Sequence, residues 1–169
     1  MLIIGAGVVG SAIARELSRY KLKIGVLEKE LDVCCESSGR NSGVLHAGFT
    51  YKTGSLRAQC CVEGNAEFDR VAFELEVPFK RTGKVIVGFT DSDRQSLLKY
   101  KALGEANGVP GLEIIDKRRL EELDSSAGGE FAMYSPSSGI LNPFVYTIAL
   151  AENAWQNGTD FFFDQQVTA

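Results

Sequence analysis

The sequence has little that would mark a nucleic-acid binder, a membrane-spanning protein or a metal protein. Its 18 lysines and arginines are outnumbered by 22 aspartates and glutamates, which gives a formal net charge of −4 without a visible basic patch. A nucleic-acid partner is therefore not expected. No apolar run approaches the roughly 20 residues needed to cross a bilayer. There is one histidine, and no cysteines have C-x-x-C spacing, so no metal site is predicted.

The four cysteines form two adjacent pairs, Cys34-Cys35 and Cys60-Cys61. Neighbouring cysteines seldom bridge each other, because a disulfide needs separated Cα atoms and facing Cβ atoms. A bridge between the two pairs stays open on sequence grounds. The sequence favours four reduced thiols in a cytoplasmic protein.

What is present is an ordinary globular composition with an early cluster of glycines. The chain has 169 residues, of which 44% are hydrophobic and 24% charged, and several of its 18 glycines lie within the first 48 positions. This composition suits a folded domain. Both ends have strand-like sequence, at residues 1–4 and at 161–169. Since a domain seldom ends inside its sheet, we expect a fragment of a longer protein.

Hydrophobic periodicity predicts a strand–helix–strand unit at the start of the chain. The strands cover residues 2–4 and 23–27, and the helix between them covers 11–20. That helix carries an apolar stripe formed by Ala12, Ile13, Leu17 and Tyr20. The crossover of such a unit is expected to be right-handed.

Capping and breaking residues predict the elements that follow. Ser55 caps a long helix that ends near Glu76, before Pro78, and a helix over 93–107 is capped by Asp91 or Ser92 and closed by Gly108. The other predicted elements are strands at 84–89 and 113–115, a helix at 117–123 after Asp116, strands on either side of 136–139, a helix over 144–157 after Asn142 and Pro143, a buried strand at 161–163 and a last strand at 167–169.

A glycine motif, Gly5-x-Gly7-x-x-Gly10, lies directly between the first strand and the first helix. In this context the first glycine permits a tight turn, the second lets the backbone approach a pyrophosphate, and the third lets helix and strand pack closely. Glu28 ends the second strand, where an acid binds ribose hydroxyls and would repel a 2′-phosphate. The alternative is a joint whose glycines are purely structural.

A loop rich in serine, glycine and arginine covers residues 37–48, where an ordinary NAD domain would continue with simple strand–helix units. Its hydroxyls, backbone N–H groups and single cation suit a second grip on a diphosphate, although a solvated loop is an equal alternative. His46, the only histidine, follows this loop beside Val44 and Leu45. A lone histidine is more often structural, but this place puts it near whatever the loop holds.

Together these motifs resemble the D-amino-acid-oxidase-like superfamily of FAD-dependent oxidoreductases. Within it, the nearest likeness is to the branch of L-2-hydroxyglutarate oxidases and the large subunit of anaerobic glycerol-3-phosphate dehydrogenase. The stretches that carry the likeness are SGRNSGVLHAG at 38–48, GSLRA at 54–58 and CVEGN at 61–65, with support from 82–84, 135–140, 143–144 and 147–153.

The resemblance implies an α/β fold, with a Rossmann-like FAD-binding domain and the start of an α+β substrate domain, truncated. The implied domains are residues 1–78, the first part of the FAD-binding domain; 79–141, part of a substrate domain; and 142–169, a return to the FAD-binding domain. It also implies bound FAD. The cofactor-binding residues would be Gly5, Gly7, Val9, Gly10, Glu28, Lys29, Ser38, Arg40, Asn41, Ser42, Gly43, Val44, Leu45 and Val167.

The implied reaction is oxidation of a small hydroxy acid or glycerol 3-phosphate by hydride transfer to the flavin, with His46 as the catalytic residue near the flavin ring. The electron acceptor would be oxygen, a quinone or a partner redox subunit. The chain could also form a homo-oligomer through its sheet edges, and could lie peripherally at the inner face of a membrane. Because family members are far longer, the fragment alone is expected to be inactive.

Two other functions remain open on the sequence. The first is an NAD-dependent Rossmann dehydrogenase, which would place a regular third strand soon after Glu28. The loop at 37–48 argues against it. The second is a non-enzymatic nucleotide-binding module that pairs through its sheet edges.

Overall fold

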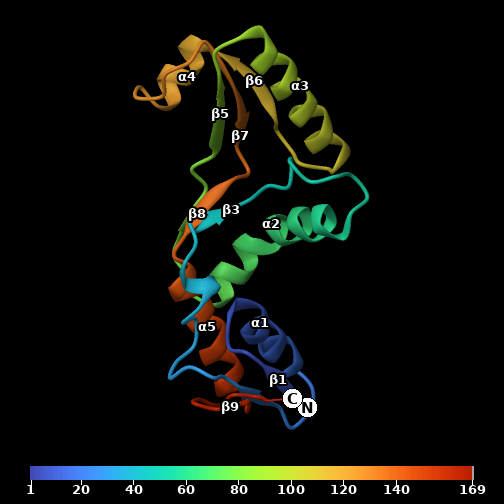
Figure 1. Ribbon diagram of the computed structural model, residues 1–169, viewed down its shortest axis with the longest axis vertical. Coiled ribbons are helices and arrows are strands. Elements are labelled where there is room, and N and C mark those ends of the chain that lie inside the picture. Colours follow the sequence, from blue (N-terminus) through green and yellow to red (C-terminus); the bar gives the residue numbers. More distant parts are fainter. Residues whose placement is uncertain (169) are drawn as a thin grey trace. The chain divides into compact units, whose positions relative to one another are not determined.

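The structure, a computed structural model, describes residues 1–168, and these fall into two compact units (Figure 1). Unit 1 is built from three separate stretches of the chain, residues 1–43, 70–78 and 141–168. Unit 2 is built from the two stretches between them, residues 44–69 and 79–140. No helix within residues 1–168 is both long and apolar enough to cross a membrane.

Unit 1 contains a parallel sheet of three strands, in the order β1 (Leu2–Ile4), β2 (Gly25–Leu27), β9 (Asp160–Phe162). Gly25 pairs with Leu2 on one side and with Asp160 on the other, so β2 is the central strand. Helix α1 (Val8–Leu17) connects β1 to β2. This is the predicted strand–helix–strand unit, which the structure confirms.

The buried face of α1 differs from the predicted one. Ser11 and Ala14 are fully buried, whereas Ile13 is 45% and Tyr20 61% exposed, so the predicted apolar stripe is wrong. The small residues matter because α1 packs against α5 (Pro143–Gln156), and Ala14 shares an apolar cluster with Ala154. The helix also begins at Val8 rather than at residue 11, since Gly10 is accommodated inside its first turn.

Helix α5 has the predicted start and end. The Asn142 side chain accepts hydrogen bonds from the backbone N–H groups of Phe144 and Val145, and Pro143 occupies the first helical position. After the helix, Gly158 has φ +90°, the left-handed conformation that glycine adopts readily.

Polar contacts join the three stretches of unit 1. Arg15 of α1 donates from Nε to Asn153 Oδ1 of α5 at 3.1 Å, and from Nη2 to Glu74 Oε2 at 2.6 Å. Its side chain is only 13% exposed. The guanidinium of Arg15, which belongs to the first stretch, therefore binds one group of the second stretch and one of the third.

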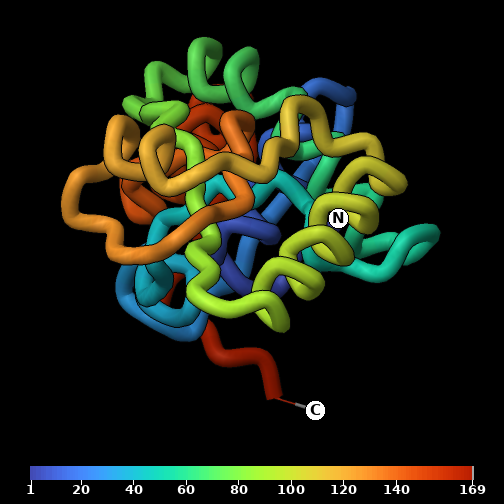
Figure 2. Tube along the Cα trace, turned by 90° about the horizontal axis from the view of Figure 1, so that it is seen from above, coloured from blue at the N-terminus to red at the C-terminus, as the bar shows by residue number. Residues whose placement is uncertain are grey.

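The chain end corrects two predictions. One outward ring is expected in the strand at 161–163, but Phe162 is 47% and Phe163 36% exposed, and Phe161 alone packs against the apolar cluster of Ala14 and Val26. Residues 167 and 168 form no strand, and Ala169 lies outside the described residues. Figure 2 draws the C-terminal stretch of unit 1 in red; its residues Asp164 and Gln165 donate from their N–H groups to the carbonyls of Glu30 and Glu28.

Unit 2 contains an antiparallel sheet in the order β5 (Lys84–Gly88), β7 (Phe131–Ser135), β6 (Glu113–Asp116). Helix α3 (Asp91–Ala106) contacts all three strands, and α4 (Lys117–Leu123) contacts β6 and β7. The main core of the unit contains Ala47, Phe49, Leu97, Val109, Leu112, Phe131 and Met133. Helix α4 has the predicted bounds, and Asp116 caps it by accepting from Arg119 N–H.

Helix α3 is capped by Thr90, not by Asp91 or Ser92. The Thr90 hydroxyl accepts from the backbone N–H of Asp93, and the Asp93 carboxylate accepts in return from the N–H of Thr90, so the two form a capping box. At the other end, the N–H groups of Gly108 and Val109 donate to the carbonyls of Glu105 and Gly104. Gly108 has φ +86° and closes the helix as predicted.

Three short strands form the remaining sheet, in the order β3 (Val44–Leu45), β8 (Gly139–Leu141), β4 (Phe79–Lys80). Strands β7 and β8 flank the predicted turn at 136–139 but belong to different sheets. Helix α2 (Leu56–Glu74) begins after Ser55, whose hydroxyl accepts from Ala58 N–H at 3.2 Å and confirms the predicted cap. A single turn of 3-10 helix, η1 (Ser37–Gly39), lies in unit 1.

Candidate functional site

The glycine turn between β1 and α1 leaves no room for side chains at its crossing point. A Cβ atom added to Gly10 would lie 1.9 Å from the carbonyl oxygen of Gly5. Gly5 itself has φ +96°, and its N–H donates to the Leu27 carbonyl at 2.8 Å, which ties the turn to β2. The first and third glycines therefore have the roles that the sequence predicted, a tight turn and a close approach of helix to strand.

The first turn of α1 is held by a side chain from the serine-rich loop. Gly7 is the N-cap residue and offers no side-chain cap, but the Ser38 hydroxyl accepts from Val8 N–H at 2.9 Å. A Cβ atom on Gly7 would lie 2.9 Å from the same hydroxyl. Because a helix N-terminus carries partial positive charge, this is a place for an anion. Val9 follows with 68% exposure.

Glu28 is a buried acid at the end of β2, with 8% exposure. Its Oε2 accepts from Ala6 N–H at 2.7 Å and its Oε1 from Glu30 N–H at 3.0 Å. The carboxylate thus binds the glycine turn directly, a role that its spacing in the sequence did not reveal. Each carboxylate oxygen can accept more than one hydrogen bond, so capacity remains for ribose hydroxyls.

Lys29 is an exposed residue held by two acids. Its Nζ lies 2.8 Å from Glu36 Oε1 and 3.3 Å from Glu30 Oε1. The hydrogen bond to Glu36 raises the pKa of Lys29 and lowers that of Glu36. Lys29 is therefore a positively charged residue directly after the buried acid.

The serine-rich loop stabilises itself through its polar side chains. Arg40 donates from Nε and Nη2 to the Cys35 carbonyl at 3.2 and 3.0 Å. Asn41 donates to the Ser38 carbonyl at 2.8 Å and accepts from Gly43 N–H at 2.9 Å. Arg40 also lines a pocket with Glu30, Cys35, Glu36 and Phe144. Ser42 is exposed beside this ordered backbone.

The structure brings most of the predicted cofactor-binding residues into unit 1. Val167 belongs to it too: it is 48% exposed, two residues after Gln165, whose N–H donates to the Glu28 carbonyl at 2.8 Å. Val44, Leu45 and His46 belong to unit 2, where Val44 pairs with Ile140 and Leu45 with Gly139.

His46 lies in unit 2 with cations near it. The imidazole is exposed, yet desolvation by the surrounding protein lowers its pKa, and the positive charges of Lys84 and Arg57 lower it further. Arg57 lies over the Tyr51 ring at 4.4 Å, and Lys84 lies 5.8 Å from the centre of the Phe49 ring. Neither cation forms an ion pair with a carboxylate among residues 1–168. His46 is therefore an imidazole of lowered pKa near two cations that pair with no carboxylate among the described residues.

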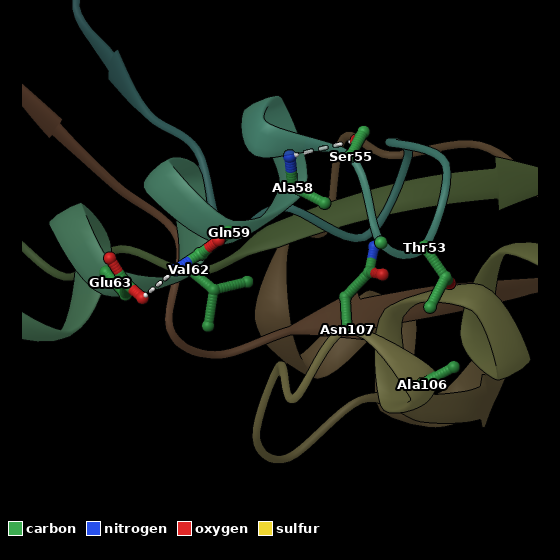
Figure 3. Close-up of a pocket in the computed structure, with 9 residues that line it drawn as sticks. Thr53, Ser55, Ala58, Gln59, Val62, Glu63, Ala106 and Asn107 are labelled. Carbon is green, nitrogen blue, oxygen red and sulfur yellow. Dashed lines mark hydrogen bonds between the residues drawn. The ribbon is translucent and has the colours of Figure 1, made fainter.

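Sequence reasoning missed two amides that hold the backbone of His46 and its neighbours, Asn65 and Asn107, and also Arg81, which donates to Asn65. Asn65 ends the CVEGN stretch, which carried the family likeness but was given no role. Asn107 lines a pocket at the start of α2 together with Ser55, Gln59 and Glu63 (Figure 3). The one general signal for such residues is that a polar side chain buried in the fold is expected to have hydrogen-bond partners.

The glycine turn, the helix N-terminus and the buried acid define a dinucleotide-binding α/β unit. Comparison with known proteins identifies its family. The sequence profile of the FAD dependent oxidoreductase (DAO) family matches residues 1–169, so the chain belongs to this family.

Two curated relatives cover almost the whole chain. It is 43% identical over 167 residues to a glycerol 3-phosphate dehydrogenase of Caloramator mitchellensis, covering 98% of this chain and 35% of that protein. It is 38% identical over 168 residues to a mitochondrial L-2-hydroxyglutarate dehydrogenase of Nematostella vectensis, covering 98% of this chain and 37% of that protein. The chain thus spans little more than a third of the length of these relatives.

Solved structures share the fold. Dithionite-reduced L-α-glycerophosphate oxidase from Mycoplasma pneumoniae, with FAD bound, matches with a TM-score of 0.94 and 30% identity, over 99% of this chain and 45% of that one. Glycine oxidase from Geobacillus kaustophilus matches with a TM-score of 0.88 at 22% identity, over 98% of this chain and 46% of that one, which shows the fold alone. These comparisons confirm the predicted fold class, the predicted family and FAD as the cofactor of the family.

Proposed function

We propose that this chain forms the FAD-binding N-terminal part of a flavoenzyme that oxidises glycerol 3-phosphate or a small 2-hydroxy acid. The observation that carries this proposal is the glycine turn, which excludes side chains at Gly10 and is held by the buried carboxylate of Glu28. The names of the curated relatives support the two substrate classes.

The predicted cofactor-binding residues, most of them in unit 1, fit the parts of FAD in chemical type. In the proposal, the pyrophosphate lies at Gly5, Gly7, Val9 and Gly10, where the N-terminus of α1 attracts an anion. Glu28 accepts hydrogen bonds from the adenosine ribose, Lys29 lies beside that ribose, and Val167 contacts adenine. Ser38, Arg40, Asn41, Ser42 and Gly43 follow the diphosphate and ribityl chain, and Val44 and Leu45 approach the flavin. The domain boundaries proposed remain residues 1–78, 79–141 and 142–169.

His46 would accept the hydroxyl proton of the substrate. Its lowered pKa keeps the imidazole neutral at pH 7, as a base requires. Bound FAD would supply the acceptor for the hydride. Glycerol 3-phosphate and 2-hydroxy acids are both anionic, and Arg57 and Lys84 offer positive charge near His46 without a competing carboxylate.

Three further assignments belong to the same proposal. The electron acceptor is oxygen, a quinone or a redox partner. Copies of the chain associate through their sheet edges, since one side of β1 and one side of β9 pair with no strand among residues 1–168. The protein is cytoplasmic and lies peripherally at the inner face of the membrane; its four free cysteines suit the reducing cytoplasm.

Titration of the 169-residue chain with FAD tests the proposal. We expect saturable quenching of flavin fluorescence, and a weaker affinity for Arg40→Ala, because this variant loses a cation and the two hydrogen bonds that order the loop. Arg118→Ala is the matched control, since Arg118 is an arginine on α4 whose side chain is 86% exposed. Binding of NAD in preference to FAD, or wild-type FAD affinity in Arg40→Ala, would contradict the assignment.

A further inference from the structure

Asn65 is a buried amide that joins three parts of unit 2. It is 7% exposed, and its Nδ2 donates to the His46 carbonyl at 2.9 Å and to the Ser137 carbonyl at 3.0 Å. It thereby connects α2, the segment that carries His46 and the turn after β7. Both protons of the amide group are used, and both acceptors are backbone groups.

Arg81 fixes the orientation of this amide. Its Nη1 donates to Asn65 Oδ1 at 2.9 Å, and its Nη2 donates to the Asn65 carbonyl at 2.7 Å. Arg81 also donates to the Ser137 carbonyl and, from Nε, to Asp69 Oδ1 at 3.2 Å. Because the guanidinium only donates, Oδ1 must face it, and Nδ2 must face the two carbonyls.

A second amide holds the same segment two and five residues further on. Asn107, at the end of α3, donates from Nδ2 to the carbonyls of Gly48 and Tyr51 at 3.0 and 2.8 Å. Between these anchors, Ala47, Gly48 and Phe49 are buried. A Cβ atom on Gly48 would lie 2.9 Å from the Val62 side chain. The segment 46–51 is thus fixed by two amides and by close packing.

From this geometry we propose that Asn65 and Asn107 are positioning residues for His46. They clamp the backbone of residues 46–51 and so set where the imidazole stands relative to Arg57 and Lys84. A catalytic role for the clamp rests on the proposed function. That the two amides position the imidazole does not depend on it.

The single histidine makes the clamp measurable in the 169-residue chain. Histidine labelled with ¹³C at its carbonyl and imidazole carbons gives one signal of each kind in nuclear magnetic resonance spectra. In Asn65→Leu, which keeps the side-chain size but loses both donors, we expect a shift of the carbonyl signal. The imidazole pKa should rise toward its ordinary value, because a loosened segment is more hydrated and stands farther from the two cations. Asn107→Leu should raise the imidazole pKa without removing the Asn65 bond.

Gln59→Ala is the matched control. Gln59 is an exposed amide on the same helix as Asn65, and its side chain donates to Glu63 at 2.9 Å rather than to a carbonyl of residues 46–51 (Figure 3). It should leave both histidine signals unchanged. If Asn65→Leu does not fold, Asn107→Leu carries the test alone. A folded variant with the wild-type imidazole pKa would overturn the proposal. Failure of the wild-type chain to bind FAD would contradict the proposed function and leave the clamp intact.

Discussion

Replacing Gly10 with alanine tests the central claim about the cofactor site. The added methyl carbon would lie 1.9 Å from the Gly5 carbonyl oxygen, whereas contacts below 3.0 Å are essentially absent from real structures. Helix α1 and the turn must therefore separate by about 1.1 Å. The turn resists this movement, because Gly5 N–H is bonded to Leu27 and Ala6 N–H to Glu28.

The expected cost follows from two opposing terms. Overpacking of a buried site costs about 1–3 kcal/mol, and a clash with backbone belongs at the upper end or beyond. Alanine in place of glycine within a helix stabilises the folded state by about 1 kcal/mol. The net loss in free energy of unfolding is then about 2 kcal/mol or more. At about 1.4 kcal/mol per tenfold, the ratio of folded to unfolded molecules falls at least about 30-fold.

Urea unfolding followed by tryptophan fluorescence measures this loss. Trp155 is the only tryptophan and lies in α5, the helix that packs against α1, so it reports on unit 1. Gly64→Ala is the matched control. Gly64 lies inside α2 with nothing within 4 Å of an added Cβ, so this variant should gain about 0.5–1 kcal/mol.

FAD affinity supplies a second readout. Gly10→Ala should bind FAD at least tenfold more weakly than the wild type, since the displaced helix no longer presents its N–H groups to the pyrophosphate. An unfolding midpoint and an FAD affinity both equal to the wild-type values would refute the reasoning.

Two further predictions concern unit 2. Lys84→Gln should raise the pKa of His46, because it removes one of the cations that lower it. The pKa is measured by titrating the resonance of the single imidazole. Lys101→Gln, which loses a lysine paired with Glu105, is the control. The pKa of His46 in the folded protein lies below the ordinary 6.5, so near this pH the unfolded chain binds more protons. The free energy of unfolding of the wild type therefore rises with pH up to about 6.5. In Lys84→Gln it should rise less. Thr90→Ala should lower the free energy of unfolding by about 1 kcal/mol, because the α3 cap is lost. Ser96→Ala, within the same helix, should change it little. If urea unfolding shows equal losses in free energy for the two variants, the result would argue against the capping box.

Local signals in the sequence predicted most helices and strands because caps and breakers act over a few residues. Asn142, Pro143 and Gly158 delimit α5 without help from the rest of the fold. The same local logic misplaced the start of α1, since the low helix propensity of Gly10 favours a start after it. Tertiary packing decides instead, because α1 must approach β1 closely.

Burial and long-range pairing were harder to predict. The stripe on α1 failed because its neighbour α5 accepts small residues, Ser11 and Ala14, rather than large ones. The pairing of β3 with β8 joins residues almost a hundred positions apart, which no local pattern encodes. For the candidate site, motif spacing indicated the glycines and Glu28. The amides that hold His46 could not be found this way, because their partners are backbone carbonyls of distant segments.

The interleaving of the two units has a consequence in time. Strand β2 acquires its second neighbour only when Asp160 pairs with Gly25, about 135 residues later in the chain. At a synthesis rate of about 5–20 residues per second, roughly 7 to 27 seconds pass before that pairing partner exists. The strands β5, β6 and β7 all lie between residues 84 and 135, so their sheet can close earlier. During synthesis, the nucleotide-binding sheet therefore waits with an open strand edge, the state in which wrong strand pairing is the main hazard.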